Sequence, residues 1–156
     1  MNRQELLQML DEKGISYELT EHVPIFTVDE MLGAKLPYAD ITAKNLFVRD
    51  DKKRNYYLIT VREDRPVNLK EFREQFGTRS LTFASENDLM AILGLTKGSV
   101  TPFGLLNDEE RKVQFFLDGS FETIGVHPME NNATVLIAAR DLAELIREHG
   151  NAITMI

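Results

Sequence analysis

The chain contains no cysteine, which excludes disulfide bonds, thiolate metal sites and cysteine nucleophiles. Only three of the 156 residues are histidines, so a histidine-based metal site would have few ligands to draw on. We therefore expect no metal and no other cofactor. The absence of cysteine is also compatible with a reducing compartment.

Long apolar runs are missing as well. The longest uninterrupted runs, residues 89–93 and 135–139, are five residues each, whereas a membrane-spanning helix needs roughly 18. The N-terminal stretch MNRQELLQML carries acidic and amide side chains and lacks the apolar centre of a secretory signal. These absences predict a cytoplasmic protein with no membrane partner.

The residues that are present suit a globular fold. Hydrophobic residues make up 43% of the chain and charged residues 28%, and 156 residues are enough to bury a continuous core. We find no linker, low-complexity tract or internal repeat, so we expect one domain over residues 1–156.

Capping signals predict five short helices. Asn2, Thr27 and Asn68 each precede a glutamate by three residues, the spacing of a capping box, and Gly14 and Gly77 are placed to end the first and third helices. The expected helices cover residues 2–13, a segment beginning at Thr27, and residues 68–76, 85–93 and 141–149.

Apolar runs between these helices predict strands over residues 15–19, 46–48, 56–61, 81–83, 113–117, 134–138 and 153–156. The polar sequence DDKKRN at residues 50–55 is typical of a hairpin turn. The hairpin and the short spacings do not fit strict βαβ repeats. The sequence therefore predicts an α+β fold, a single domain with a mixed β-sheet surrounded by helices.

The charge is unevenly distributed. The net charge of −7 argues at first against a polyanionic partner. However, residues 44–79 hold ten of the 18 basic residues and six of the 25 acidic ones, a local charge of +4, which leaves −11 elsewhere. A phosphate-bearing ligand could meet this positive region, although a solvated hairpin tip and an ordinary helix pair would explain the same residues.

Common catalytic motifs are absent, since the chain has no G-x-S-x-G, H-E-x-x-H, Walker A or G-x-G-x-x-G sequence. Lys44 and Asn45 stand at the start of an apolar strand, where ligand groups are often held. Lys44 could clamp a phosphate or orient a carbonyl. A solvated lysine before a strand is the alternative.

Two loops are further candidates. In residues 96–104, Gly98 and Pro102 frame a segment that could present backbone N–H groups to an oxyanion, or could be an ordinary turn. In residues 125–134, His127 precedes a buried strand and could take part in proton transfer. A histidine satisfied by the backbone in a proline turn is the alternative.

Taken together, these features resemble the stand-alone prolyl-tRNA editing proteins, the YbaK/ProX-type family related to the editing domain of bacterial prolyl-tRNA synthetases. The resemblance extends over almost the whole chain. The matching segments are Glu21-His22-Val23-Pro24, Phe26-Thr27, Lys44-Asn45-Leu46-Phe47, Arg49-Asp50, Phe83-Ala84-Ser85, Gly98-Ser99-Val100-Thr101-Pro102-Phe103-Gly104, Asn107-Asp108, His127-Pro128, Asn131 and Thr134.

The resemblance implies a hydrolase that deacylates mischarged tRNA(Pro) and is most similar to the Ala-tRNA(Pro)-clearing branch. It implies catalytic roles for Lys44, Gly98 and His127, with Lys44 holding the terminal nucleotide or the substrate backbone. The implied substrate-binding residues are Phe26, Met31, Asn45, Ser99, Val100, Thr101 and Pro102. The implied partners are the tRNA(Pro) acceptor end and, as an open option, prolyl-tRNA synthetase.

An enzyme without a protein nucleophile is chemically reasonable for this substrate. An aminoacyl ester is already activated, so positioning a water, stabilising the oxyanion and using a ribose hydroxyl of the terminal adenosine can suffice. A small pocket could accept alanine and reject proline. The alternatives are a Cys-tRNA(Pro) or broader deacylase, a non-catalytic module that binds tRNA or a synthetase, and a domain that binds a small ligand.

Overall fold

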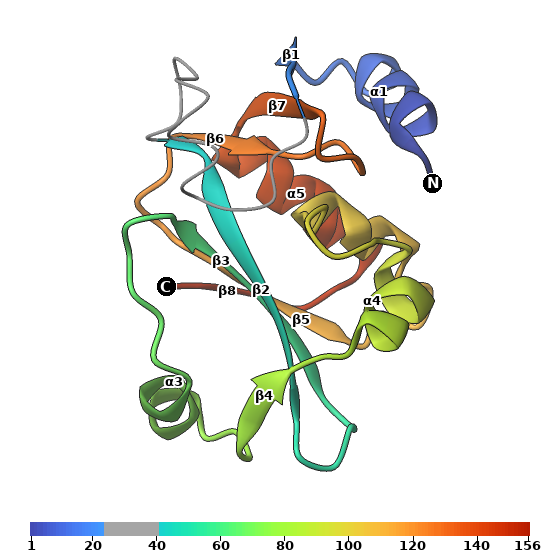
Figure 1. Cartoon of the computed structure of the whole chain (residues 1–156). Helices are drawn as coiled ribbons and strands as arrows, with labels where there is room; N and C mark the ends of the chain where they lie inside the picture. Colours follow the sequence, from blue (N-terminus) through green and yellow to red (C-terminus); the bar gives the residue numbers. More distant parts are fainter. Residues whose placement is uncertain (24–40) are drawn as a thin grey trace.

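The fold combines two β-sheets with helices at their faces and ends. The computed structural model describes residues 1–23 and 41–156, and Figure 1 shows their arrangement. The elements are α1 (Arg3–Glu12), β1 (Tyr17–Glu21), β2 (Ala43–Asp50), β3 (Tyr56–Arg62), α3 (Leu69–Phe76), β4 (Leu81–Phe83), α4 (Glu86–Leu93), the 3-10 helix η2 (Pro102–Asn107), β5 (Val113–Leu117), β6 (Thr123–Val126), β7 (Ala133–Ala138), α5 (Ala139–His149) and β8 (Ile153–Met155).

The strands form a five-stranded sheet of order β4-β2-β3-β5-β8 and a three-stranded sheet of order β1-β7-β6. The larger sheet is mixed, because β2 pairs antiparallel with β3 and β4 whereas β5 runs parallel to β3 and β8. The smaller sheet is entirely antiparallel. A parallel bridge between Thr42 and Gly125 joins the start of β2 to β6 and so connects the two sheets.

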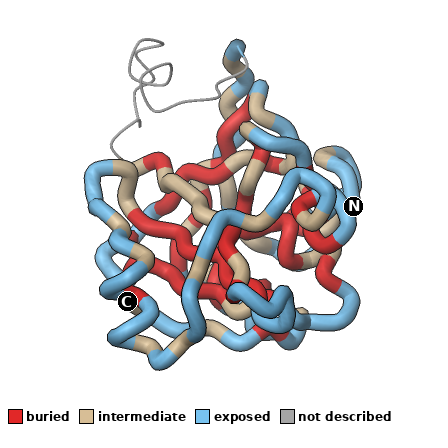
Figure 2. The backbone as a smooth tube through the Cα atoms, turned by 60° about the horizontal axis from the view of Figure 1, so that its bottom comes forward, coloured by how far each residue is buried: buried red, intermediate tan, exposed pale blue. Residues whose placement is uncertain are grey.

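Two clusters of buried side chains hold these layers together. The larger lies between the two sheets, α1, α4 and α5, and contains the fully buried Phe103 and Phe115. The smaller lies between α3 and the other face of the five-stranded sheet, where Phe72 packs edge-on against Phe116 with ring centroids 4.8 Å apart. Figure 2 shows the buried backbone inside and the exposed segments around it.

The α+β fold class is confirmed, but the expected single sheet is divided in two. The second sheet forms because β7 pairs with β1 on one side and with β6 on the other. β6 was not predicted, because Gly125 and Thr123 leave only a short apolar signal. Gly125 is closely packed, since a Cβ there would lie 3.2 Å from the Thr42 hydroxyl and from the Leu136 side chain, closer than most Cβ contacts.

The helix signals are confirmed for the described helices. Asn2 forms a capping box with Glu5, Asn68 caps α3, and Ser85 accepts a hydrogen bond from the Asp88 N–H. Helix α5 begins at Ala139, two residues before the expected start, because β7 runs directly into it without a capping side chain. The helix expected from Thr27 lies outside the described residues.

The first strand is displaced from its expected position and β2 is longer than expected. β1 covers Tyr17–Glu21 rather than residues 15–19, and β2 covers Ala43–Asp50 rather than residues 46–48. In both cases pairing with a neighbouring strand extends the element into polar sequence, which apolar alternation cannot detect. The hairpin at residues 50–55 is confirmed.

Candidate functional site

Strand β2 has an edge that is only partly covered. β4 pairs with Val48, Arg49 and Asp50 and then ends, and the Ala84 N–H donates to the Phe47 carbonyl at 3.0 Å. Main-chain groups alternate in direction along a strand, so those of Asn45 point to the same edge as those of Phe47. No described strand pairs with Asn45 on this edge, which leaves a gap in the sheet.

A pocket of about 430 Å³ lies at this gap. β2 contributes Asn45 and Phe47, while the end of β4 and the start of α4 contribute most of the other walls. The loop after α4 closes it with Lys97 and Val100. The lining residues are Asn45, Phe47, Phe83, Ala84, Ser85, Glu86, Leu89, Lys97 and Val100. Two of the expected site segments, the start of β2 and the Gly98–Pro102 loop, therefore meet here.

The Asn45 side chain is held in a fixed orientation. Its Oδ1 accepts a hydrogen bond of 2.6 Å from the hydroxyl of Thr60, the residue directly opposite on β3. Thr60 is fully buried. Because the Thr60 hydroxyl fixes the oxygen, the Asn45 amide NH₂ is the group left to donate to a ligand.

Lys44 and Asn45 leave β2 on opposite faces, as neighbouring residues of a strand do. Lys44 is opposite Val61, which belongs to the cluster under α3, whereas Asn45 and Phe47 line the pocket. Lys44 is partly exposed and makes no ion pair with the described residues. The structure therefore places the expected site lysine beside the same strand edge as the pocket but not among its lining residues.

The Gly98–Pro102 loop is tightly built. Gly98 has φ of 93°, in the left-handed region, and the Ser99 N–H donates to the Thr96 carbonyl at 3.0 Å. Ser99, Thr101 and Pro102 are buried, and Pro102 begins η2. Since the Ser99 N–H is already bonded, it is not free to stabilise an oxyanion. The Val100 N–H makes no hydrogen bond with the described residues and is the better placed donor.

The Thr101 hydroxyl in this loop is an exception to the usual satisfaction of buried polar groups. It is fully buried, and its oxygen has no hydrogen-bond partner within residues 1–23 and 41–156. Gly104, three residues on, packs so closely on Leu95 that a Cβ would lie 2.6 Å from it. Close packing on one side therefore holds the loop in place.

His127 belongs to a second polar group at the junction of the two sheets. Its Nδ1 lies 2.9 Å from the Ala133 carbonyl, and its ring centroid lies 6.2 Å from that of His22. The Nε2 of His22 in turn lies 2.8 Å from the hydroxyl of the buried Thr134. A short loop and three strands thus bring together two histidines and a threonine from distant parts of the chain.

Burial lowers the pKa of His127 below its usual value of 6.5. The nearby His22 lowers this pKa further, while the hydrogen bond to the Ala133 carbonyl opposes the shift. His127 is therefore neutral at pH 7. Its Nδ1–H donates to the Ala133 carbonyl, so Nε2 carries the lone pair and can accept a hydrogen bond or a proton.

The bridge between Thr42 and Gly125 links the strand that carries Lys44 and Asn45 to the strand that precedes His127. Lys44 and His127 each follow a bridged residue by two positions, Lys44 within β2 and His127 directly after β6. On the other face of β2, Asn45 contributes to the pocket. The start of β2 thus carries Lys44 and Asn45, meets the Gly98–Pro102 loop at the pocket, and is bridged to the strand that precedes His127.

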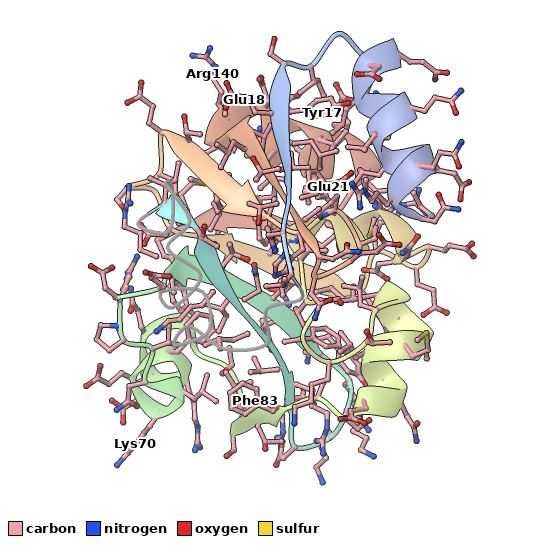
Figure 3. The ribbon with its side chains drawn as sticks, turned by 45° about the horizontal axis from the view of Figure 1, so that its top comes forward. Tyr17, Glu18, Glu21, Lys70, Phe83 and Arg140 are labelled. Atoms are coloured by element: carbon pink, nitrogen blue, oxygen red, sulfur yellow. The ribbon has the colours of Figure 1, made fainter. Side chains whose placement is uncertain are left out.

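Five of the ten basic residues in the 44–79 region lie at the hairpin tip and on α3, outside these groups. Lys52, Lys53 and Arg54 are exposed at the tip of the β2–β3 hairpin, and Lys70 and Arg73 are exposed on α3. Figure 3 shows Lys70 at the opposite end of the molecule from Glu18 and Arg140. We call the five residues Lys52, Lys53, Arg54, Lys70 and Arg73 the basic end.

The hairpin tip is not wholly a solvated turn. The Asp50 side chain is fully buried and accepts hydrogen bonds from the Lys52 and Arg54 N–H groups and from the Asn55 amide. Burial alone raises the pKa of Asp50, but these hydrogen bonds outweigh it and the pKa is lowered. Asp50 thereby fixes the turn that carries the basic residues.

Two expected site residues lie beyond the described ranges, and several residues near the site were not predicted from the sequence. Phe26 and Met31 lie outside the described residues. His22 and Thr134 received no role in the sequence analysis, although both stand in segments that matched the family pattern. Phe83 and Lys97 were also missed as pocket residues. Pairing of β4 with β2 brings Phe83 to the pocket, and the loop after α4 brings Lys97 there; both are long-range contacts that the sequence does not reveal.

Two features are absent from the described residues, a metal-binding group and a membrane-spanning helix. Within them, no group of three or more acidic, histidine or cysteine side chains is arranged to hold a metal ion. Over the same ranges, 1–23 and 41–156, no helix has both the length and the apolar character needed to cross a membrane.

The fold matches solved structures over almost the whole chain. A solved structure described as a candidate trans-editing enzyme for prolyl-tRNA synthetase superimposes with a TM-score of 0.68 at 18% identity, covering 99% of this chain and 96% of that one. The hypothetical protein APE2540 gives a TM-score of 0.69 at 20% identity, with 97% of each chain covered. At these identities the likeness concerns the fold alone.

Sequence comparison gives the family. The model of the aminoacyl-tRNA editing domain matches residues 22–145, and the chain belongs to this family. The chain is 39% identical to the prolyl-tRNA editing protein ProX of Acetoanaerobium sticklandii, over 99% of this chain and 96% of that protein. It is 36% identical to the mouse prolyl-tRNA synthetase associated domain-containing protein 1, over 96% and 92% respectively. The expected family and enzyme class, an aminoacyl-tRNA editing deacylase, are confirmed.

Proposed function

We propose that this protein hydrolyses mischarged Ala-tRNA(Pro) in the cytoplasm, releasing alanine after a synthetase has attached it in error. The observation that carries the proposal is the pocket in which the open edge of β2 at Asn45 meets the Gly98–Pro102 loop at Val100. Membership of the editing family and the likeness to a prolyl-tRNA editing protein support the reaction class and the tRNA.

The proposed chemistry uses a water molecule as the nucleophile. The ester carbonyl lies against the loop, where the Val100 N–H stabilises the negative charge that develops on its oxygen. The Asn45 amide NH₂, fixed by Thr60, donates to the substrate. A ribose hydroxyl of the terminal adenosine assists the attacking water, so no nucleophilic side chain is required.

Lys44 and His127 act from the other face of β2 in this proposal. The Lys44 ammonium neutralises a phosphate of the tRNA end or holds the substrate backbone. His127 is neutral at pH 7, so its Nε2 can accept a hydrogen bond from the substrate without opposing the charge of Lys44. β2 positions Lys44, and the hydrogen bond to the Ala133 carbonyl positions His127 after β6.

The alanine specificity rests on the resemblance of Lys44-Asn45, Ser99 to Pro102 and His127-Pro128 to the alanine-clearing branch. Parallel hydrolysis assays with Ala-, Cys-, Ser- and Pro-charged tRNA(Pro) test it. We expect fast release of alanine and stable Pro-tRNA(Pro). Preferential release of cysteine, or release of several amino acids, would favour the Cys-specific or broader deacylase instead.

A further inference from the structure

Phe83 lines the pocket although most of its surface is exposed. It is the last residue of the edge strand β4, and 60% of its surface is exposed. Figure 3 shows it beside β4, at some distance from the smaller sheet. The other large apolar side chains exposed in the described residues, Met1, Leu19, Val23, Met90 and Met155, are not aromatic. An exposed aromatic ring beside a pocket is a typical platform for a nucleobase.

Lys97 supplies a cation to the same pocket. It is exposed, stands directly before Gly98, and makes no ion pair with the described residues. The acceptors around the pocket include the Glu86 carboxylate, whereas the Ser85 hydroxyl already accepts a hydrogen bond from the Asp88 N–H. The pocket thus combines an exposed ring, a free cation and a carboxylate.

This combination matches the chemistry of a nucleotide. A base has a flat face for Phe83, a phosphate has a charge for Lys97, and amino or hydroxyl groups can donate to Glu86. The pocket volume, about 430 Å³, is in the range of sites for whole small molecules and is generous for the side chain of alanine alone. The size therefore favours a nucleoside over an amino acid as its principal occupant.

The spacing of the pocket residues along β2 also fits a bound nucleotide. Phe83 pairs with Val48, three residues beyond Asn45, and three residues of a strand span about 10 Å. This separation leaves room for a base at the Phe83 end while the attached ester reaches the Asn45 and Val100 end. One nucleotide can therefore occupy the pocket and present its ester to the loop.

We propose that Phe83 stacks on the terminal nucleobase of the tRNA 3′ end while Lys97 contacts a backbone phosphate. This inference rests on the proposed function, because it assigns the tRNA end to the pocket beside the reacting ester. Phe83 is a positioning residue in this scheme, since it contacts the base and not the reacting atoms.

The test measures binding of two uncharged RNA minihelices, one ending in ACCA and one lacking the terminal adenosine. Wild-type protein binds the complete end more tightly. Phe83→Ala weakens binding of the complete minihelix roughly tenfold, the scale of one lost base stack, and abolishes the preference. Phe83→Tyr keeps it, because tyrosine also stacks. Met90→Ala, a change at another exposed apolar residue outside the pocket lining, leaves both affinities unchanged.

Kinetics and folding controls complete the test. Circular dichroism and thermal unfolding establish that Phe83→Ala is folded, as its exposed position predicts. In deacylation assays the variant raises KM with little change in kcat, because the lost contact is uniform binding. Lys97→Ala weakens binding of both minihelices and reduces its salt dependence.

The outcomes separate this inference from the proposed function. If Phe83→Ala binds both minihelices as the wild type does, the stacking role is wrong even when deacylation is normal. If the wild type releases no amino acid but its preference for the complete end depends on Phe83, the stacking role holds and the proposed hydrolysis fails. If free AMP competes as strongly as the complete minihelix, the pocket is a free-nucleotide site and the assignment to the tRNA end is overturned.

Discussion

Lys44 and Asn45 are neighbours in sequence, yet they reach different surroundings because a strand directs successive side chains to opposite faces. Asn45 faces the pocket and is fixed by Thr60, whereas Lys44 stands opposite Val61. Each can therefore contact a different part of a bound tRNA end. The two residues therefore have separate predicted roles.

Lys44→Ala should lower kcat/KM for Ala-tRNA(Pro) by at least about 100-fold, the scale seen when a key electrostatic contact to the transition state is removed. Lys44 is partly exposed and makes no ion pair with the described residues, so the fold should survive. Lys44→Arg serves as the charge-matched control and should recover part of the activity. Full activity in a folded Lys44→Ala protein would remove the role assigned to this lysine.

Replacing Gly98 with valine should reduce turnover through the loop, because φ of 93° is strained for any residue with a Cβ. Gly77→Val is the matched control, since Gly77 has φ of 66° with open space around it but ends α3, outside the pocket lining. Unfolding measurements should show comparable destabilisation in both variants. Only Gly98→Val should lose deacylation beyond that, and equal activity in the two variants would contradict the loop's role.

The lowered pKa of His127 predicts a particular pH dependence. Because the folded protein holds this imidazole neutral, deacylation should persist below pH 6.5 and decline only as His127 takes up its proton. The stability of the fold depends on pH in the same direction. The unfolded chain binds the proton more readily than the folded protein does, so His127 lowers the free energy of unfolding as the pH falls through 6.5. His127→Gln should lessen that loss of stability as the pH falls below 6.5. An acid limb of activity at or above pH 6.5 would contradict the assignment.

At the scale of elements, the β2–β3 hairpin is organised by one buried carboxylate. Asp50 binds the turn through Lys52, Arg54 and Asn55, and the same hairpin continues into the strand that carries Lys44 and Asn45. The turn therefore stabilises the register on which the site depends.

Asp50→Ala should lower the free energy of unfolding by about 2–4 kcal/mol, because it removes the carboxylate that accepts three hydrogen bonds within the turn. Asp51→Ala, next in the chain, removes only the exposed pair with Arg79 and should destabilise the protein much less, because an exposed ion pair contributes little. Urea unfolding of both variants checks the difference. Since the pKa of Asp50 is lowered in the fold, its contribution should be present above its ordinary pKa of 3.8 and be lost as pH falls below it.

Local chemistry predicted the elements better than it predicted their assembly. Asn2, Asn68 and Ser85 identified their helices because a cap is made by residues adjacent in sequence. β6 could not be predicted, because its pairing with β7 and its bridge to Thr42 are long-range contacts. The pocket was missed for the same reason: Phe83 reaches Asn45 only because β4 pairs with β2.

At the scale of the whole molecule, the charge is separated along its length. The hairpin tip of the basic end lies seven or more residues of extended strand from Lys44, about 24 Å, while the acidic residue Glu18 lies at the other end of the molecule (Figure 3). This separation fits a tRNA whose 3′ end enters the pocket while its stem passes the basic end. The negative remainder of the surface should limit binding of other RNA.

The double variant Lys52→Glu and Lys53→Glu should weaken tRNA binding and lower the slope of log affinity against log salt by about 2. A control of equal charge change, Lys13→Glu with Arg140→Glu, alters exposed residues at the end of α1 and on α5, elements away from the β2–β3 hairpin and α3 in Figure 1. Lys13→Glu also removes an exposed ion pair with Glu148. Filter binding over a range of salt concentrations measures both. Identical slopes in the two double variants would show that the basic end does not contact the RNA.

The most direct test of the account is hydrolysis of Ala-, Cys-, Ser- and Pro-charged tRNA(Pro) by the wild-type protein, with folded Lys44→Ala measured in parallel. The account predicts rapid release of alanine, intact Pro-tRNA(Pro), and near loss of alanine release in the variant. Salt-sensitive tRNA binding without release of any amino acid would contradict it and identify the protein as a binding module.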